Sequence, residues 1–342
     1  MHEHMIAAWP GVEFDHRGVF DWDAVADEVA AELAAGKARH GFQTVVDITP
    51  PELGRDPFFI AEVSRRSGVN LVAVTGFFCQ SMGIPYHWRR QSIDEVADFH
   101  VRDITEGMVF ANQVTSIRAG IIKIATGQDD LHPRPTPVGP SGRHIGDVED
   151  RIIRAAARAQ VRTGAPLTTH TDPEDWSVTN IGAEHLDILE EEGVDPHRVI
   201  TGHCFVNPRI DWLKEILDRG SSLQIDNIGT GWRDLDDEHI SEAVAELVAE
   251  GYEDQLVISF DRFFYQRRGP LTANDPIVAE KMQIDYMHDE FLPLLRQKGV
   301  GDDAIQKMLV VNPARHLAFD PPAAPDAVGI TDGSWAAEAS PA

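Results

Sequence analysis

Short apolar runs alternate with longer stretches of helical period along the chain. Seven runs rich in β-branched residues predict strands, because buried parallel strands consist of nearly continuous hydrophobic segments. These runs are Thr44–Ile48, Leu71–Thr75, Ile121–Ala125, Pro166–Thr169, Arg198–Thr201, Ser221–Ile225 and Leu256–Phe260. The predicted helices are Asp23–Ala35, Asp56–Ser67, Asp147–Thr163, Ala183–Glu192, Asp211–Arg219, Glu238–Glu250 and Pro276–Lys298. Such alternation is typical of βα units repeated around a parallel sheet.

The expected fold is a (β/α)₈ TIM barrel of the α/β class, formed by residues 1–320 as a single domain. The strand that completes the set of eight must then end at His2–His4, at the very start of the chain. Because barrel closure gives every strand two neighbours, we expect this first strand to be truncated and the natural chain to start upstream. After Pro321 the sequence loses its periodicity, which predicts a flexible tail over residues 321–342.

The charge balance limits the partners that the protein can bind. With 56 acidic against 30 basic residues, the net charge of −26 repels nucleic acid and anionic membranes. No apolar run approaches the roughly 18–20 residues that a membrane span needs. The first residues lack the basic and apolar regions of a secretory signal, so the cytoplasm is the expected location. The two cysteines, Cys79 and Cys204, are too few for a disulfide framework.

Candidate metal ligands stand at the predicted strand ends. In His2-x-His4 the two imidazoles point to the same face of a strand and can hold one ion. The other candidates each lie at the C-terminal end of a different predicted strand, where barrel enzymes place their active sites. They are Lys123, His170, His203 and Asp261. Singly, each has a structural alternative: a surface lysine, core histidines or a helix cap. Together they favour one metal site.

Lys123 stands in an unusually apolar strand, flanked by Ile122 and Ile124. A lysine in such surroundings must find a partner or lose its charge, and a lowered pKa would free its amine. The free amine could then react with CO₂, and the carbamate formed is a bidentate anion able to bridge two cations. This is a hypothesis from the sequence.

These segments resemble the phosphotriesterase family of the amidohydrolase superfamily. The stretches that carry the resemblance are Met1-His-Glu-His4, Val46-Asp-Ile48, Gly54-Arg-Asp56, Ala73-Val-Thr-Gly76, Gly120-Ile-Ile-Lys-Ile-Ala-Thr126, Thr169-His-Thr171, Gly202-His203, Asp261 and Asn312-Pro-Ala-Arg315. They extend over nearly the whole predicted barrel, in the order and spacing of the family.

The resemblance implies a centre of two divalent ions. His2, His4 and Asp261 would hold the more buried ion, and His170 and His203 the more exposed one. Carbamylated Lys123 would bridge both ions together with a hydroxide, and Asp261 would accept the proton of that hydroxide. Zn²⁺ suits the imidazole and carboxylate ligands best, with Mn²⁺, Co²⁺ or Fe as alternatives.

The candidate substrate-binding residues are Phe78, Trp232, Arg233 and Phe263. Lactonases of the family usually carry a tyrosine at the position of Phe78, so its missing hydroxyl weakens a lactonase assignment, whereas an aromatic ring suits a phosphotriesterase pocket. Trp232 and Arg233 lie in a segment that resembles a substrate-facing loop, although a surface loop with a locally packed tryptophan is the alternative. Phe263 could form an apolar pocket wall or simply pack in the eighth loop.

The leading functional interpretation is a hydrolase of small-molecule phosphotriesters or lactones. An amide or carboxylate-ester hydrolase with the same metal site is the second, because loops set specificity in barrels. A non-catalytic barrel that binds one ion or none is the third. A homodimer is expected from the family resemblance alone.

Overall fold

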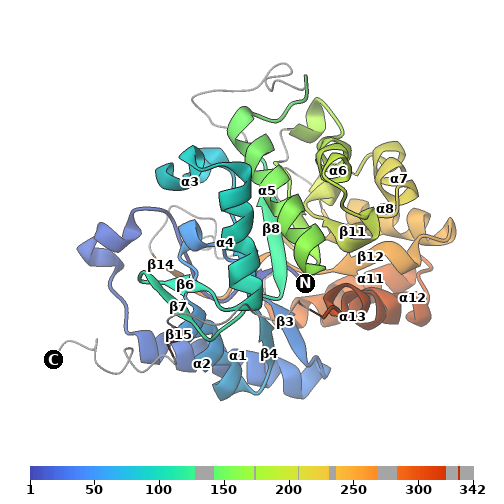
Figure 1. Cartoon of the computed structure of the whole chain (residues 1–342). Helices are drawn as coiled ribbons and strands as arrows, with labels where there is room; N and C mark the ends of the chain where they lie inside the picture. The colour runs from blue at the N-terminus through green and yellow to red at the C-terminus, as the bar shows by residue number, and fades with distance from the viewer. Residues whose placement is uncertain are drawn as a thin grey trace.

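The computed structural model describes residues 1–127, 142–172, 175–206, 208–230, 236–267, 283–320 and 330–331. It is an α/β structure in which helices surround a set of parallel strands (Figure 1). Within these ranges, no helix has the length and apolar character needed to cross a membrane.

Six parallel strands form the main sheet, in the order β12-β11-β10-β9-β8-β5. The strands are β5 (Val74–Gly76), β8 (Ile121–Ala125), β9 (Leu167–His170), β10 (Val199–Thr201), β11 (Ser222–Ile225) and β12 (Leu256–Ile258). Nearly every residue in them is buried, as expected for a parallel sheet covered on both faces. Consecutive strands lie side by side from β8 to β12, so their C-terminal ends meet at one edge of the sheet.

Two shorter parallel pairs extend this arrangement. β3 (Thr44–Val46) pairs with β4 (Asn70–Val72), and β1 (Glu3–His4) pairs with β13 (Arg262–Phe263). A bridge between Glu3 and Asp47 links β1 to the end of β3. Ala73 alone separates β4 from β5. β2 (Ala7–Ala8) pairs with β14 (Gln266–Arg267), and a small sheet contains β6 (Val109–Phe110), β7 (Gln113–Thr115) and β15 (Ile330–Thr331).

The helices follow the strands with clear start signals. Asp56 caps the helix that follows β3 by accepting the N–H groups of Phe58 and Phe59, and Ser92 and Glu95 form a capping box at a later helix. The α-helices are α1 (Trp22–His40), α2 (Pro57–Ser67), α3 (Tyr86–Arg90), α4 (Ile93–Thr105), α5 (Asp147–Thr163), α6 (Ile181–Glu191), α7 (Ile210–Asp218), α8 (Asp237–Ala249), α10 (Ile284–Tyr286), α11 (Leu292–Gln297), α12 (Asp302–Gln306) and α13 (Asn312–Leu317).

The remaining helical turns are short. Two π-helical turns, η11 (Met287–Phe291) and η12 (Lys307–Val311), continue neighbouring α-helices. The 3₁₀ turns are η1 (Val12–Phe14), η2 (His16–Gly18), η3 (Pro51–Leu53), η4 (Gln80–Met82), η5 (Asp175–Ser177), η6 (Pro196–Arg198), η7 (Cys204–Val206) and η9 (Glu253–Gln255). The largest hydrophobic cluster lies between the main sheet and helices α4 to α8 and α11 to α12.

Six of the seven predicted strands occur with ends that differ by no more than two residues, whereas the predicted strand Leu71–Thr75 is divided at Ala73 into β4 and β5. Glu3–His4 forms the additional parallel strand at the N-terminus. The helix predicted from Pro276 begins outside the described residues, and its later part is α10 to α11. Most of the predicted tail also lies outside them, although Ile330–Thr331 pairs with β7. The prediction contained neither α4 nor the final helices α12 and α13.

Candidate metal centre

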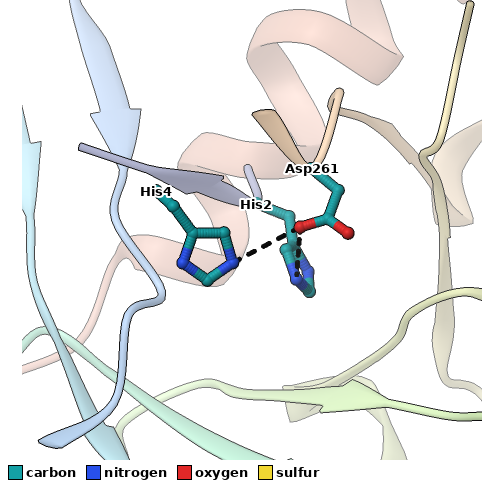
Figure 2. A group of neighbouring side chains, drawn as sticks. All are labelled: His2, His4 and Asp261. Atoms are coloured by element: carbon teal, nitrogen blue, oxygen red, sulfur yellow. Dashed lines mark ion pairs between the residues drawn. The ribbon is translucent and has the colours of Figure 1, made fainter. Parts of the chain in front are cut away.

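Three predicted ligands meet where the N-terminal strand lies beside the segment after β12 (Figure 2). The Asp261 backbone N–H donates to the carbonyl of His2. Asp261 Oδ1 lies 3.6 Å from His2 Nε2 and 3.4 Å from His4 Nε2. Asp261 has a φ of 61°, a left-handed conformation that is uncommon outside glycine and often marks a functional site. The strand β1 and this backbone turn thus aim two imidazoles and one carboxylate at a common point.

Glu3 fastens these two segments together. Its carboxylate accepts the backbone N–H groups of Phe260 at 3.0 Å and Arg262 at 2.9 Å, on either side of Asp261. Burial raises the pKa of Glu3 to about 7. Because side chains alternate along a strand, Glu3 points away from its neighbours His2 and His4, which share the other face. The Glu3 carboxylate therefore holds the backbone on which the ligands stand.

His203 approaches the same carboxylate from the main sheet, and His170 lies beside His203. His203 follows β10 with a φ of 56°, and its Nε2 atom lies 3.7 Å from Asp261 Oδ2. The ring of His203 lies 5.0 Å from that of His2 and 4.2 Å from that of His170, measured between centroids. Asp261 thus has the N-terminal histidines on one oxygen and His203 on the other.

Lys123 is fully enclosed within β8, with only 1% of its surface exposed. Burial is the largest influence on its pKa and lowers it to about 8, against the opposing pull of the Asp261 and Glu52 carboxylates. The Nζ atom lies 4.9 Å from the centroid of the Phe78 ring, which in turn is 4.5 Å from the His170 ring. The amine and His170 therefore share one aromatic neighbour.

A glycine makes room for the strand that carries Lys123. Gly76 pairs with Lys123 in the register of β5 and β8 and has a φ of 131°. A Cβ atom at this position would lie 2.0 Å from the carbonyl oxygen of Lys123. Only glycine allows this close approach of the two backbones.

The other ring nitrogens of the histidines have partners of their own. His4 Nδ1 lies 2.8 Å from Thr49 Oγ1, and the Thr49 N–H donates to the Asp47 carboxylate. His203 Nδ1 lies 2.8 Å from Asn227 Nδ2 and 3.3 Å from Asp226 Oδ1. Contacts of this kind fix the orientation and tautomer of an imidazole whose other nitrogen binds an ion.

The donor set fits divalent ions. Among the described residues, His2 Nε2 and His203 Nε2 are buried without a hydrogen-bond partner. Burial lowers the pKa of both His2 and His170, which favours the neutral rings that metal binding requires. In the part of the chain that the structure describes, two groups of ligands lie close enough to hold an ion: His2 with His4 and Asp261, and His2 with His203 and Asp226.

The sequence profile of the Phosphotriesterase family matches residues 1–317. The chain belongs to this family. Members are metal-dependent hydrolases that act on ester bonds, and so is this protein. The chain is 33% identical over 279 residues to an aryldialkylphosphatase of Saccharolobus solfataricus, covering 81% of each chain. It is 29% identical over 297 residues to a phospho-furanose lactonase of Mycoplasmopsis synoviae, covering 82% of this chain and 76% of the relative.

Solved structures of the family superpose well on the fold. An organophosphorus hydrolase from Deinococcus radiodurans matches with a TM-score of 0.80 and 31% identity, over 93% of this chain and 91% of that one. A structure described as organophosphate hydrolysis engineered from a weak promiscuous lactonase template matches equally well, at 30% identity over 93% and 94% of the two chains.

The structure describes two of the four predicted substrate-binding residues, Phe78 and Phe263. Phe78 lies over Lys123 and His170, and Phe263 stacks on the His4 ring at 4.4 Å between centroids. Trp232 and Arg233 lie outside the described residues. The placement of the two phenylalanines at the ligand side chains is compatible with a role in substrate binding, which stays a prediction.

Asp226 and Gln224 were not predicted from the sequence. Asp226 directly follows β11, so the strand-end criterion that selected His203 and Asp261 applies to it as well. It was instead assigned to the loop that continues to Trp232. Gln224 is a polar residue in the middle of an apolar strand, and that contrast was its only signal in the sequence.

Proposed function

We propose that this chain is a binuclear-metal hydrolase that attacks a lactone or phosphotriester bond with water activated between two divalent ions. The Asp261 carboxylate carries the proposal, since its oxygens lie 3.4, 3.6 and 3.7 Å from the Nε2 atoms of three imidazoles. A carboxylate in this position connects the ligands of one ion with those of the other.

We propose that the strands close into a (β/α)₈ barrel with the centre at its C-terminal mouth. A path of backbone contacts supports closure: β1 joins β3 through the Glu3 bridge to Asp47, and the Asp261 N–H returns to His2. The Ser259 N–H donates to Ile225, so the chain is still paired with β11 just before it reaches β1. Closure along this path would give each strand two neighbours, as a barrel requires.

His2, His4 and Asp261 would hold one ion, and His170 and His203 the other, with Zn²⁺ as the ion that the ligands suit best. Two such ions, when bound, polarise the phosphoryl or carbonyl oxygen of the substrate and lower the pKa of the attacking water. Phe78 and Phe263 would exclude bulk water from this position, because their rings cover Lys123 and His4.

Asp261 and Lys123 carry the proposed chemistry of the chain itself. The pKa of Asp261 is lowered to about 2, because His4 and His203 outweigh the opposing effect of burial, so its carboxylate is ionised and can accept the proton of the attacking water. The neutral Lys123 amine attacks CO₂, forming an N–C bond and releasing one proton. The carbamate that results would be an anionic ligand for the ions.

A substrate panel tests the reaction class. Metal-reconstituted protein would be assayed on lactones, paraoxon-like triesters and aryl esters of matched leaving group. We expect kcat/KM to be highest for a lactone or a triester and to vanish after chelation. Preference for an amide or a plain carboxylate ester would contradict the proposal.

Substitution of Lys123 tests the bridge. Lys123→Ala should lower kcat by at least about 100-fold, because each ion loses a ligand. Short carboxylic acids that replace the carbamate should restore part of the activity. Lys37→Ala is the matched control: its ammonium donates to the Gly68 carbonyl at the surface, and its loss should leave kcat unchanged. Full activity of Lys123→Ala without added acid would exclude the bridge.

A further inference from the structure

Gln224 connects the two groups of metal ligands. It is fully buried in β11. Its Nε2 atom lies 2.6 Å from His2 Nδ1 and 2.7 Å from Asp226 Oδ2. The same Asp226 oxygen accepts the backbone N–H of His203 at 3.0 Å, and Oδ1 lies 3.3 Å from His203 Nδ1. One continuous series of contacts thus runs from His2 through Gln224 and Asp226 to His203.

A buried amide such as that of Gln224 is unfavourable unless its polar atoms have hydrogen-bond partners. Its strand neighbours Leu223 and Ile225 pack in the hydrophobic cluster on the opposite face of the strand, so the Gln224 side chain lies on the same face as Asp226. A buried polar group without a hydrogen-bond partner destabilises the folded state. The Nε2 atom of Gln224 has two partners, whereas Oε1 has none among the residues that the structure describes. The amide oxygen is therefore free to take a new partner if the amide turns.

Metal binding by His2 would favour rotation of the Gln224 amide. A histidine that offers Nε2 to an ion carries its proton on Nδ1, and that N–H needs an acceptor. The amide of Gln224 lies within hydrogen-bond distance of His2 Nδ1, and its oxygen would accept the N–H after rotation. Because the Gln224 Nε2 atom also donates to Asp226 Oδ2, rotation replaces this donor with the amide oxygen, which repels the carboxylate. Asp226 would then turn away from Gln224 and interact more strongly with His203.

We propose that Gln224 is a positioning residue that couples the two half-sites, so that filling the site at His2 tightens the site at His203. The inference rests on the two-ion centre of the proposed function. It predicts that the ions bind with positive cooperativity, and it assigns the coupling to one amide rather than to the ligands themselves.

A metal titration without substrate tests this coupling. Apo protein would be titrated with Zn²⁺ by calorimetry and with Co²⁺ by its visible absorption, and wild type should bind two ions with a Hill coefficient above one. Gln224→Met keeps the volume but removes both contacts. We expect it to weaken the first ion about 10- to 100-fold and to abolish cooperativity.

Two further variants test the contacts of Gln224 with His2 and Asp226 separately. Gln224→Glu keeps an acceptor for His2 but repels Asp226, so the first ion should bind as in wild type while the second binds without cooperativity. Ser222→Ala is the matched control on the same strand. It removes a buried contact of 2.8 Å with His316 Nε2 and should leave both affinities unchanged. Circular dichroism would confirm that each variant is folded.

The outcomes distinguish this inference from the proposed function. Two ions bound cooperatively by a Gln224→Met variant, or without cooperativity by wild type, would overturn the coupling and leave the hydrolase standing. Cooperative binding of two ions by a wild type that hydrolyses none of the panel would overturn the hydrolase and leave the coupling. A wild type that binds one ion or none would overturn both.

Discussion

Glu52 shows how one buried side chain shapes the surroundings of the metal ligands. It lies in η3, and its carboxylate accepts the backbone N–H of Phe78, the residue whose ring covers Lys123. Burial raises the pKa of Glu52 to about 7, with Lys123 and Arg55 acting in the opposite direction. The Glu52 carboxyl group therefore holds the Phe78 segment in place. Because burial disfavours its ionised form, its contribution to stability depends on pH.

We therefore expect the effect of Glu52→Gln on the free energy of unfolding to depend on pH. The pKa of Glu52 in the folded protein lies above the unfolded value of 4.5. The stability that protonated Glu52 contributes is therefore complete below about pH 4.5 and is lost as the pH rises through about 7. The variant should match wild type near pH 4.5 and be more stable by roughly 1–3 kcal/mol at pH 8. Urea unfolding of the apo proteins at both pH values measures the difference, with Glu28→Gln on the exposed face of α1 as control. An equal difference at both pH values would contradict the assignment.

Phe78 allows a prediction about substrate choice. A tyrosine at this position would place a hydroxyl group above Lys123, where it could donate to a substrate oxygen. Phe78→Tyr should raise kcat/KM for lactones about 5- to 10-fold, the effect of one added hydrogen bond, and change paraoxon-like triesters less. The ratio of the two kcat/KM values in one preparation is the measurement. A ratio that stays constant would remove Phe78 from substrate recognition.

At the scale of elements, strand ends were predictable from the sequence and side-chain networks were not. The C-terminal end of a parallel strand can be located from hydrophobicity alone, so His170, His203 and Asp261 could be selected in advance. The role of Gln224 depends on its contact with His2, which is 222 residues away in sequence, and therefore could not be predicted. Helix α4 was missed although Ser92 and Glu95 mark its start, because the buried face includes His100 and Asp103, which interrupt its apolar stripe.

The pairing of β5 with β8 predicts a severe effect of Gly76→Ala. The new methyl group would meet the Lys123 carbonyl at 2.0 Å, and alanine also disfavours the φ of 131°. We expect a loss of stability of more than about 4 kcal/mol or a failure to accumulate folded protein. Gly146→Ala is the matched control, since a Cβ atom there contacts nothing within 4 Å, and it should cost no more than about 1 kcal/mol. Thermal unfolding of both variants is the measurement, and similar melting temperatures would contradict the close approach.

The whole molecule is strongly acidic, with a net charge of −26. Some of this charge is neutralised locally: Arg154, for example, contacts Asp150, Glu191 and Glu192 between α5 and α6. With 30 basic against 56 acidic residues, acidic side chains are in large excess, and their mutual repulsion opposes the compact state. The expected homodimer would concentrate this charge further, and it stays a prediction.

Salt should therefore stabilise the protein. Raising KCl from 10 mM to 0.5 M shortens the screening length from about 30 Å to less than about 5 Å, which weakens repulsion between surface carboxylates. We expect the melting temperature of the apo protein to rise by about 3–8 °C. Sucrose of equal osmolality is the control for solvent exclusion, and an equal rise in sucrose, or a fall in KCl, would rule out screening as the cause.

The pairing of β1 with β13 has a consequence for biosynthesis. His2 and His4 leave the ribosome more than 250 residues before Asp261. Until Arg262 and Phe263 emerge, the N-terminal strand lacks its β13 partner, although contacts such as those with Asp47 and Thr49 can already form. Nascent chains arrested before this point would lack a complete ion site, so loading with metal would be a late event that reports a fully assembled fold.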